Sequence, residues 1–167
     1  NVVDRVTVVD PHPVLALATM ADVVPVLEQV QGRFDAIILA TKPQIASEVM
    51  PQLSSFVTHT NFFLSIAAGK TTTFFEQYLG HDKAIIRAMP NTPCQIQKGI
   101  TALYATPSVS TQAKQTAHRL FAPTGLVFDI TNEDMMHAIT AVTASGPGFL
   151  FYAMEVLMHN QTREAAI

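Results

Sequence analysis

The chain has 167 residues, of which 49% are hydrophobic and 14% charged, and its formal net charge is −3. This composition predicts a globular protein with a buried core rather than a disordered chain. Because the chain is slightly acidic and has no basic stripe, nucleic acid and anionic membrane surfaces are poor candidates as partners. We also expect no membrane-spanning segment, because no apolar run approaches the roughly 20 residues that a bilayer requires.

The N-terminal sequence and the single cysteine indicate a cytoplasmic protein. Asp4 and Arg5 stand where a secretory signal would have a long apolar segment. Cys94 fits a reducing compartment, and it is open to interpretation as a reactive thiol or as a small packing residue. Because the sequence opens with Asn1 rather than Met, we expect the gene product to begin upstream.

Apolar strands alternate with helical segments over the first 130 residues, and this alternation predicts an α/β fold. In chain order, strands are expected at 5–10, 23–27, 35–44, 61–66, 84–86, 99–105 and 126–130, and helical segments at 14–20, 27–34, 45–55, 71–79 and 108–121. The strand at 35–44 is almost wholly apolar, which is typical of a parallel strand covered on both faces. Within 45–55, the fourfold spacing of Ile45, Val49 and Leu53 predicts the buried face. We therefore predict an open, mostly parallel, doubly wound sheet.

The pattern changes at Asn132. Helices are expected at 133–143 and 149–159, separated by an interruption at 144–148 that contains two glycines and a proline. We therefore predict a sheet domain at 1–130 and part of a helical domain at 131–167.

Small residues or stiff loops follow three of the predicted strands, at 40–43, 65–69 and 89–93. Ligands of open α/β sheets bind outside the carboxyl ends of the strands, so these segments predict one edge of a crevice for a large flat cofactor. In the third segment, Pro90 and Pro93 restrict the backbone around Asn91. The same loop also fits a rigid turn that binds nothing.

Two charged residues at strand ends each allow two interpretations. Asp10 follows the first predicted strand, where an acid can hydrogen-bond a ribose, but it also fits a turn before a proline. Lys42, with Thr41, is the obvious partner for a phosphate or ribose, or it is an ordinary solvated lysine. We expect no metal site, because none of the six histidines has a partner at metal-ligand spacing.

Four segments, 39–44, 65–69, 80–93 and 144–149, together resemble the motifs of the pyrroline-5-carboxylate reductase family, in order and in spacing. The resemblance runs from about Val6 to Leu157. It implies a dinucleotide-binding (Rossmann-like) domain followed by an α-helical dimerisation domain. It further implies reduction of 1-pyrroline-5-carboxylate to L-proline with NADPH or NADH, by a homodimer or higher homo-oligomer.

The resemblance also points to particular residues. Together with Asp10, the cofactor-binding residues we expect are Ala40, Thr41, Lys42, Pro43, Ile66, Ala67, Ala68 and Asn91. Ser145 and Gly146 are expected to bind substrate at a helix start, where backbone amides can hold its carboxylate. Thr162 matches the position of a hydroxyl that serves the imine nitrogen, and we expect it to be the catalytic residue.

The sequence departs from the family pattern in two respects. It contains neither the first strand with its glycine-rich phosphate loop nor most of the helical domain. Because 162–167 resembles residues that follow the missing helical segment, we expect a gap in the chain between Gln161 and Thr162. A normal peptide bond there would remove Thr162 from the site.

Two other functions fit parts of the sequence. A hydroxyacid-dehydrogenase-type oxidoreductase shares the sheet but needs a lysine as its acid, and 149–159 contains none. A non-catalytic or truncated binding module would explain the absence of the glycine-rich loop. The choice between NADPH and NADH stays open, because an acid such as Asp10 favours NADH whereas family members often prefer NADPH.

Overall fold

A computed structural model describes residues 3–164 of the chain. The elements of the first half are β1 (Thr7–Val9), η1 (Leu15–Thr19), β2 (Asp22–Val24), η2 (Leu27–Gln29), β3 (Phe34–Leu39), α1 (Ala46–Val49), η3 (Met50–Phe56), β4 (Thr60–Ser65) and α2 (Thr72–Leu79). Those of the second half are β5 (Ile85–Met89), η4 (Thr92–Ile96), β6 (Gly99–Ala105), α3 (Thr111–Phe121), η5 (Ala122–Thr124), β7 (Gly125–Ile130), α4 (Met135–Thr140), η6 (Ala141–Ser145) and α5 (Gly146–Glu164). The η elements are 3-10 helices, except η6, which is a π-helix.

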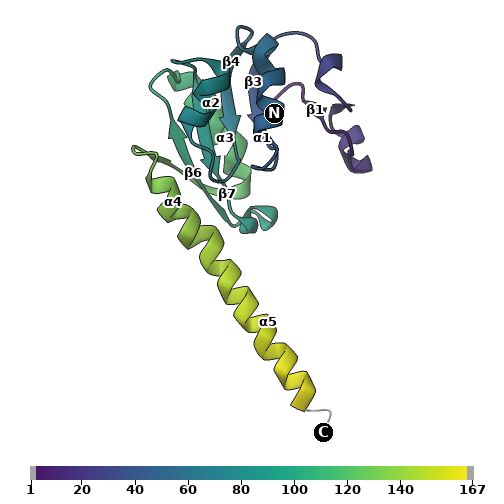
Figure 1. Cartoon of the computed structure of the whole chain (residues 1–167), viewed down its shortest axis with the longest axis vertical. Coiled ribbons are helices and arrows are strands. Elements are labelled where there is room, and N and C mark those ends of the chain that lie inside the picture. Colours follow the sequence, from purple (N-terminus) through teal and green to yellow (C-terminus); the bar gives the residue numbers. More distant parts are fainter. Residues whose placement is uncertain (1–2, 165–167) are drawn as a thin grey trace.

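Five strands form one sheet in the order β3-β4-β5-β6-β7 (Figure 1). β3, β4 and β5 run parallel, β6 is antiparallel to β5, and β7 is parallel to β6. The connection from β5 to β6 contains only the short η4, which is too short for a parallel crossover, whereas α3 provides one between β6 and β7. The predicted α/β fold with a mostly parallel sheet is therefore confirmed.

β1 and β2 pair in parallel as a separate two-stranded sheet. In a doubly wound sheet the strands, numbered along the chain, lie side by side in the order 3-2-1-4-5-6. In this chain β1 and β2 correspond to strands 2 and 3 of that order, and β3 corresponds to strand 4. Strand 1 would lie between β1 and β3. No such strand is present among residues 3–164, so β3 forms an edge of the five-stranded sheet.

Helices cover both faces of the sheet because its central strands are apolar on both sides. On one face, α2 and η3 pack on Phe63 and Ile85. On the other face, α3 packs on Phe62, Leu64 and Ile86. α4 contributes Met136 to a third cluster with β5, β6 and β7. The result is a three-layer α/β/α arrangement that holds the ends of the parallel strands in place.

The buried face of 45–55 differs from the predicted one. The segment begins as α1 but continues as the 3-10 helix η3, in which Met50, Leu53 and Phe56 are buried. A 3-10 helix has three residues per turn, so its buried positions recur every three residues rather than every four. Ile45, which was expected in the core, is 43% exposed.

The expected interruption at 144–148 is absent. α4, η6 and α5 follow one another without a break and form one long helix, Met135–Glu164, which we call the arm (Figure 1). The prediction was wrong because the π-helix just before Gly146 accommodates Pro147 inside the helix instead of ending it. The first part of the arm packs on the sheet, and the rest projects away from it.

The apolar character of the arm also corrects the expectation on membrane-spanning length. Met135–Met158 has 24 residues and a mean hydropathy of 1.2, which is long and apolar enough to cross a bilayer by length and composition alone. A helix that is covered by protein passes the same test, so this property by itself is weak evidence. No residue of its most apolar 18-residue stretch is buried, and Phe149, Phe151, Tyr152 and Leu157 are all more than half exposed.

Candidate functional site

The carboxyl ends of β3, β4 and β5 lie side by side at one edge of the sheet. Leu39 pairs with Ser65, and Ser65 pairs with Arg87. The Ile66 N–H donates to the Leu39 carbonyl at 3.2 Å, which keeps the two chains together just beyond the strands. The segments 40–43, 66–69 and 90–93 therefore leave the sheet at neighbouring points, as the sequence predicts.

The segments after β3 and β4 present mostly small side chains at this edge. Ala67 is buried and its N–H donates to Ser65 Oγ at 3.2 Å, so the turn after β4 is held by its own strand end. Gly69 has a φ of +73°, a conformation that favours glycine. Ala40, Lys42 and Ala68 are exposed, whereas Thr41, Pro43 and Ile66 are half-buried. Their roles in cofactor binding stay predictions.

Asn91 uses its side chain to join the loop after β5 to two other segments. Its Oδ1 accepts from the Ile100 N–H at 2.8 Å, and its Nδ2 donates to the Thr143 carbonyl at 3.3 Å. The first contact fixes the loop against β6, and the second fixes it against the arm. The structure thus gives Asn91 a structural part in addition to the predicted cofactor contact, which stays a prediction.

The contact with Thr143 compensates for a proline. In an α-helix the Thr143 carbonyl would accept from the N–H of residue 147, but Pro147 has no N–H. Asn91 Nδ2 supplies a donor to this carbonyl from outside the helix. The stiff loop after β5 is therefore joined by this hydrogen bond to the π-helical turn of the arm.

A buried ion pair that the sequence analysis missed lies behind the strand ends. Arg87 Nη1 and Glu133 Oε1 are 2.7 Å apart, and the Arg87 side chain is 3% exposed. Glu133 also accepts from the Thr72 N–H at 2.7 Å and from the Thr72 hydroxyl at 2.6 Å. The only signal in the sequence is an arginine inside an otherwise apolar strand, which requires a partner but does not identify it.

These contacts set the charge state of Glu133. Burial by itself would raise the pKa of the Glu133 carboxyl, but the hydrogen bonds from Thr72 and Arg87 and the charge of Arg87 outweigh it, so the pKa lies below its ordinary value of 4.5. Glu133 is therefore a carboxylate at neutral pH, which suits a fixed partner for Arg87.

Asp10 lies directly after β1, at the end of the separate sheet of β1 and β2. Its Oδ1 accepts from the His12 N–H at 2.8 Å, which is the turn that one of the two interpretations predicts. Its own N–H donates to the Val24 carbonyl at 3.0 Å. The contact of Asp10 with a ribose stays a prediction.

The predicted substrate residues lie within the arm. Ser145 and Gly146 are exposed, but they are not at a helix start, because the Gly146 N–H donates to the Ala141 carbonyl inside the π-helix. The expectation that free backbone amides at a helix start hold the substrate carboxylate here is therefore wrong. A role for Ser145 would have to use its hydroxyl. α5 runs through Gln161 and Thr162 as one helix. The side chain of Thr162 lies outside the described residues, and the catalytic role and the chain gap stay predictions.

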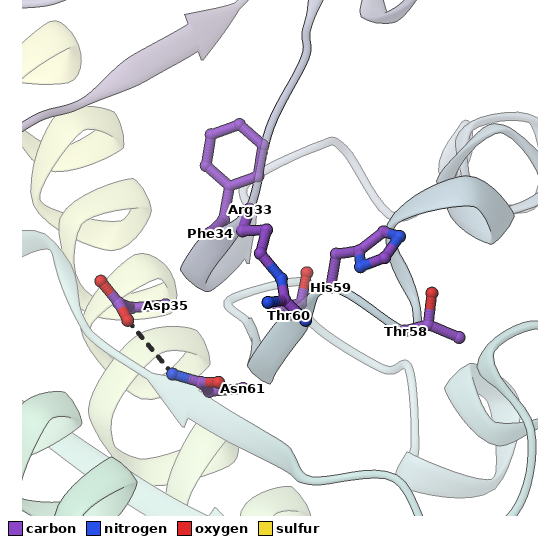
Figure 2. A pocket seen from close by; sticks show the side chains of 7 residues that line it. All are labelled: Arg33, Phe34, Asp35, Thr58, His59, Thr60 and Asn61. Atoms are coloured by element: carbon purple, nitrogen blue, oxygen red, sulfur yellow. Dashed lines mark hydrogen bonds between the residues drawn. The ribbon is translucent and has the colours of Figure 1, made fainter.

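A polar hollow of about 310 Å³ lies at the opposite edge, at the beginnings of β3 and β4 (Figure 2). Its lining residues are Arg33, Phe34, Asp35, Thr58, His59, Thr60 and Asn61. Two of these residues are hydrogen-bonded to each other, because Asn61 Nδ2 donates to Asp35 Oδ1 at 3.1 Å. The hollow contains none of the predicted site residues. Across the described part of the chain, no group of three His, Cys, Asp or Glu residues could hold a metal ion.

The sheet, its strand order and the edge of small residues define a class: the described residues have a Rossmann-like α/β fold without its first strand, followed by a helix. Comparison with known proteins specifies the family. The chain is 32% identical over 123 residues to pyrroline-5-carboxylate reductase of Pseudomonas aeruginosa, which is 74% of this chain and 45% of that protein. It is 36% identical over 123 residues to pyrroline-5-carboxylate reductase 1 of Bacillus subtilis, with 74% of this chain and 41% of that protein covered.

Solved structures agree. The structure of 1-pyrroline-5-carboxylate reductase from Streptococcus pyogenes matches with a TM-score of 0.73 at 27% identity, over 90% of this chain and 56% of that chain. Pyrroline carboxylate reductase of Plasmodium falciparum with NADP bound matches with a TM-score of 0.69 at 26% identity, over 78% of this chain and 49% of that chain. No family model matches the chain.

The predicted resemblance is therefore confirmed: over about three quarters of its length the chain is a homologue of the pyrroline-5-carboxylate reductase family. The chain spans less than half the length of the curated relatives it matches.

Proposed function

We propose that the complete gene product reduces 1-pyrroline-5-carboxylate to L-proline with NADPH or NADH, as a step of proline biosynthesis. The observation that supports this most is that the segments resembling the family's cofactor loops lie side by side in the structure. The segments 40–43, 66–69 and 90–93 leave adjacent strands at one edge, within a chain that is 32–36% identical to enzymes of that name.

The reaction requires little acid–base catalysis by the protein. A nicotinamide cofactor supplies a hydride, which adds to the carbon of the protonated imine, so the ring nitrogen becomes an amine and the cofactor leaves oxidised. The protein has to hold the two reactants together, exclude water and offer a hydrogen bond to the ring nitrogen. The family resemblance implies that Thr162 makes this last contact, and in our proposal this role requires the expected gap in the chain before Thr162.

The residues at the strand ends fit a dinucleotide in one important respect. Ala40, Ala67 and Ala68 leave room for a flat ring to approach the backbone, and the exposed Lys42 can meet a phosphate or ribose. Thr41, Pro43, Ile66, Asn91 and Asp10 complete the proposed cofactor site. A glycine-rich phosphate loop is not in this sequence, so in our proposal a further part of the gene product supplies it.

The arm supports a proposal on assembly. It carries apolar side chains on several sides, with Phe149 76% exposed and Leu157 65% exposed. An exposed apolar surface of this kind marks a contact with another protein or with a membrane. We propose that the arm joins the rest of a helical domain in a cytoplasmic homodimer or higher homo-oligomer, and that the Ser145 hydroxyl, next to Gly146, faces the substrate from it.

The test is an assay of the complete gene product. Purified protein with 1-pyrroline-5-carboxylate should oxidise NADPH or NADH, and mass spectrometry should detect L-proline in equal amount. A folded preparation that turns over neither cofactor would instead support a non-catalytic module. Turnover of a hydroxyacid with NAD⁺, without imine reduction, would support the dehydrogenase alternative.

A further inference from the structure

Glu133 connects the base of the arm to the first residue of helix α2 and to strand β5, both of which lie close to the proposed cofactor loops. It lies between the end of β7 and the first residue of the arm. Its Oε2 accepts from the Thr72 hydroxyl, and its Oε1 accepts from the Thr72 N–H and from Arg87 Nη1. Thr72 is the first residue of α2, three residues after the loop 66–69 ends, and Arg87 lies in β5, three residues before the loop 90–93 begins.

The geometry leaves this carboxylate no freedom. Both oxygens are engaged at 2.6–2.7 Å by donors from two different elements, so the carboxylate cannot rotate without breaking a contact. Arg87 shares its side of β5 with Ile85 and Met89, because alternate residues of a strand face the same way. The ion pair is therefore held beneath helices α2 and α4, and not at the free surface.

A second joint lies further along the arm, where Asn91 Nδ2 meets the Thr143 carbonyl. Beyond it the arm leaves the sheet (Figure 1). The direction of the arm is thus fixed by polar contacts at 133 and 143, together with the packing of Met136 and Ile139 between them. Ser145 follows the second joint by two residues.

We propose that Glu133 is a positioning residue for hydride transfer, and this inference rests on the function proposed above. It fixes the arm, which carries the substrate side of the site, relative to the loops that hold the cofactor. Hydride transfer requires the reacting atoms to be about 3–3.5 Å apart, and a misplacement of about 1 Å can cost a hundredfold in rate. All of the proposed cofactor residues precede the arm in the chain, so we expect loosening of this joint to change the rate more than the Kd for the cofactor.

The test compares Glu133→Gln with Glu28→Gln in the complete gene product. Glu28 is exposed in η2, before β3, and belongs to none of the segments 40–43, 66–69 and 90–93. We expect Glu133→Gln to lower kcat about 10- to 100-fold, with the Kd for NADPH within about twofold of the parent value. Glu28→Gln should change neither. An unchanged kcat in folded Glu133→Gln, or a Kd that rises as much as kcat falls, would overturn the proposal.

A milder pair of variants covers the case in which Glu133→Gln does not fold. Thr72→Val keeps the shape of the side chain but removes the hydroxyl donor, whereas Thr72→Ser keeps the donor. We expect a several-fold loss of kcat in the first and recovery in the second, again without a change in the Kd for NADPH. Equal kcat in the two variants would contradict the inference.

Hydrogen exchange separates this inference from the proposed function. In Glu133→Gln, the amides of Thr72 and of 135–143 should exchange at least about tenfold faster than in Glu28→Gln, because the joint is loosened. If the parent protein has no imine reductase activity, the proposed function fails while faster exchange still supports the joint. Unchanged exchange would show that Glu133 does not hold the arm.

Discussion

The side-chain amide of Asn91 and the main-chain carbonyl of Thr143 meet at 3.3 Å, 52 residues apart in the chain. This contact replaces the hydrogen bond that Pro147 cannot make. It links a proline-stiffened loop to a proline-containing helix, and the two features therefore depend on each other.

Substitution of Asn91 and Pro147 should accordingly be non-additive. Asn91→Ala removes a donor to Thr143 and an acceptor from Ile100, and we expect it to lower the free energy of unfolding by about 2 kcal/mol. In a Pro147→Ala background, the new N–H of residue 147 can donate to Thr143, so the same substitution should cost about 1 kcal/mol less. Urea unfolding of the four proteins gives the coupling, and strict additivity would contradict it.

The Arg87–Glu133 pair should be far more costly to break than an exposed pair. Glu133→Ala leaves a buried guanidinium without its partner, and we expect the free energy of unfolding to fall by about 3 kcal/mol or more. Replacing both residues, as Arg87→Met with Glu133→Leu, should recover most of this loss.

The matched control for this comparison is the Arg5–Asp22 pair, whose atoms are 2.8 Å apart but whose side chains are 82% and 57% exposed. Asp22→Ala should change the free energy of unfolding by less than about 1 kcal/mol. Similar losses of unfolding free energy at the two pairs, measured by chemical denaturation, would show that burial does not decide how much an ion pair contributes to stability.

Acid should weaken the same pair. The pKa of Glu133 is lower in the folded protein than its ordinary value of 4.5, so the folded state binds fewer protons and stability rises with pH through this region. The contribution is fully present above pH 4.5 and is lost as pH falls through the lowered pKa. We expect the stability difference between the parent and Glu133→Gln to shrink below pH 4.5. A difference that stays constant down to acid unfolding would refute this assignment.

Two glycines with positive φ should respond differently to alanine. Gly32 has a φ of +112° and open space where a Cβ would stand, whereas Gly125 has a φ of +139° and a Cβ there would overlap the backbone of Gly99. Gly32→Ala adds only backbone strain and should cost about 1 kcal/mol. Gly125→Ala adds a clash at the pairing of β6 with β7 and should cost about 3 kcal/mol or more. Thermal unfolding followed by circular dichroism checks the order.

Lys42 offers a direct test of the cofactor edge. If Lys42 meets a phosphate, Lys42→Gln should raise the Kd for NADPH about tenfold in the complete gene product. Lys114→Gln is a suitable control, since Lys114 is exposed on α3 and belongs to none of the segments at the proposed cofactor edge. Equal Kd values for the two variants would assign Lys42 to solvent.

Local chemistry made much of the fold predictable. Thr71 caps α2 by accepting from the Phe74 N–H, and Gly80 ends it with a φ of +93°. Ser110 caps α3 in the same way, by accepting from the Ala113 N–H. Caps and glycine stops are decided by neighbouring residues, so a sequence shows them directly.

The errors have a common cause in contacts between distant residues. The helix through Pro147 looks broken in sequence because its compensating donor, Asn91, lies in another loop. The same holds for Glu133, whose partner Arg87 is 46 residues away. At the site, the neighbouring strand ends follow from the parallel order and were predictable, whereas the joint that orients the arm was not.

The length of the arm has a mechanical consequence. Met135–Glu164 rises about 1.5 Å per residue, so it extends roughly 45 Å from its base. A rotation of about 5° at that base displaces Ser145 by about 1 Å but the far end by about 4 Å, by simple lever geometry on that rise. Small displacements beside Thr72 and Glu133 should therefore grow along the helix. Substitutions there should alter subunit assembly as well as the rate of the reaction.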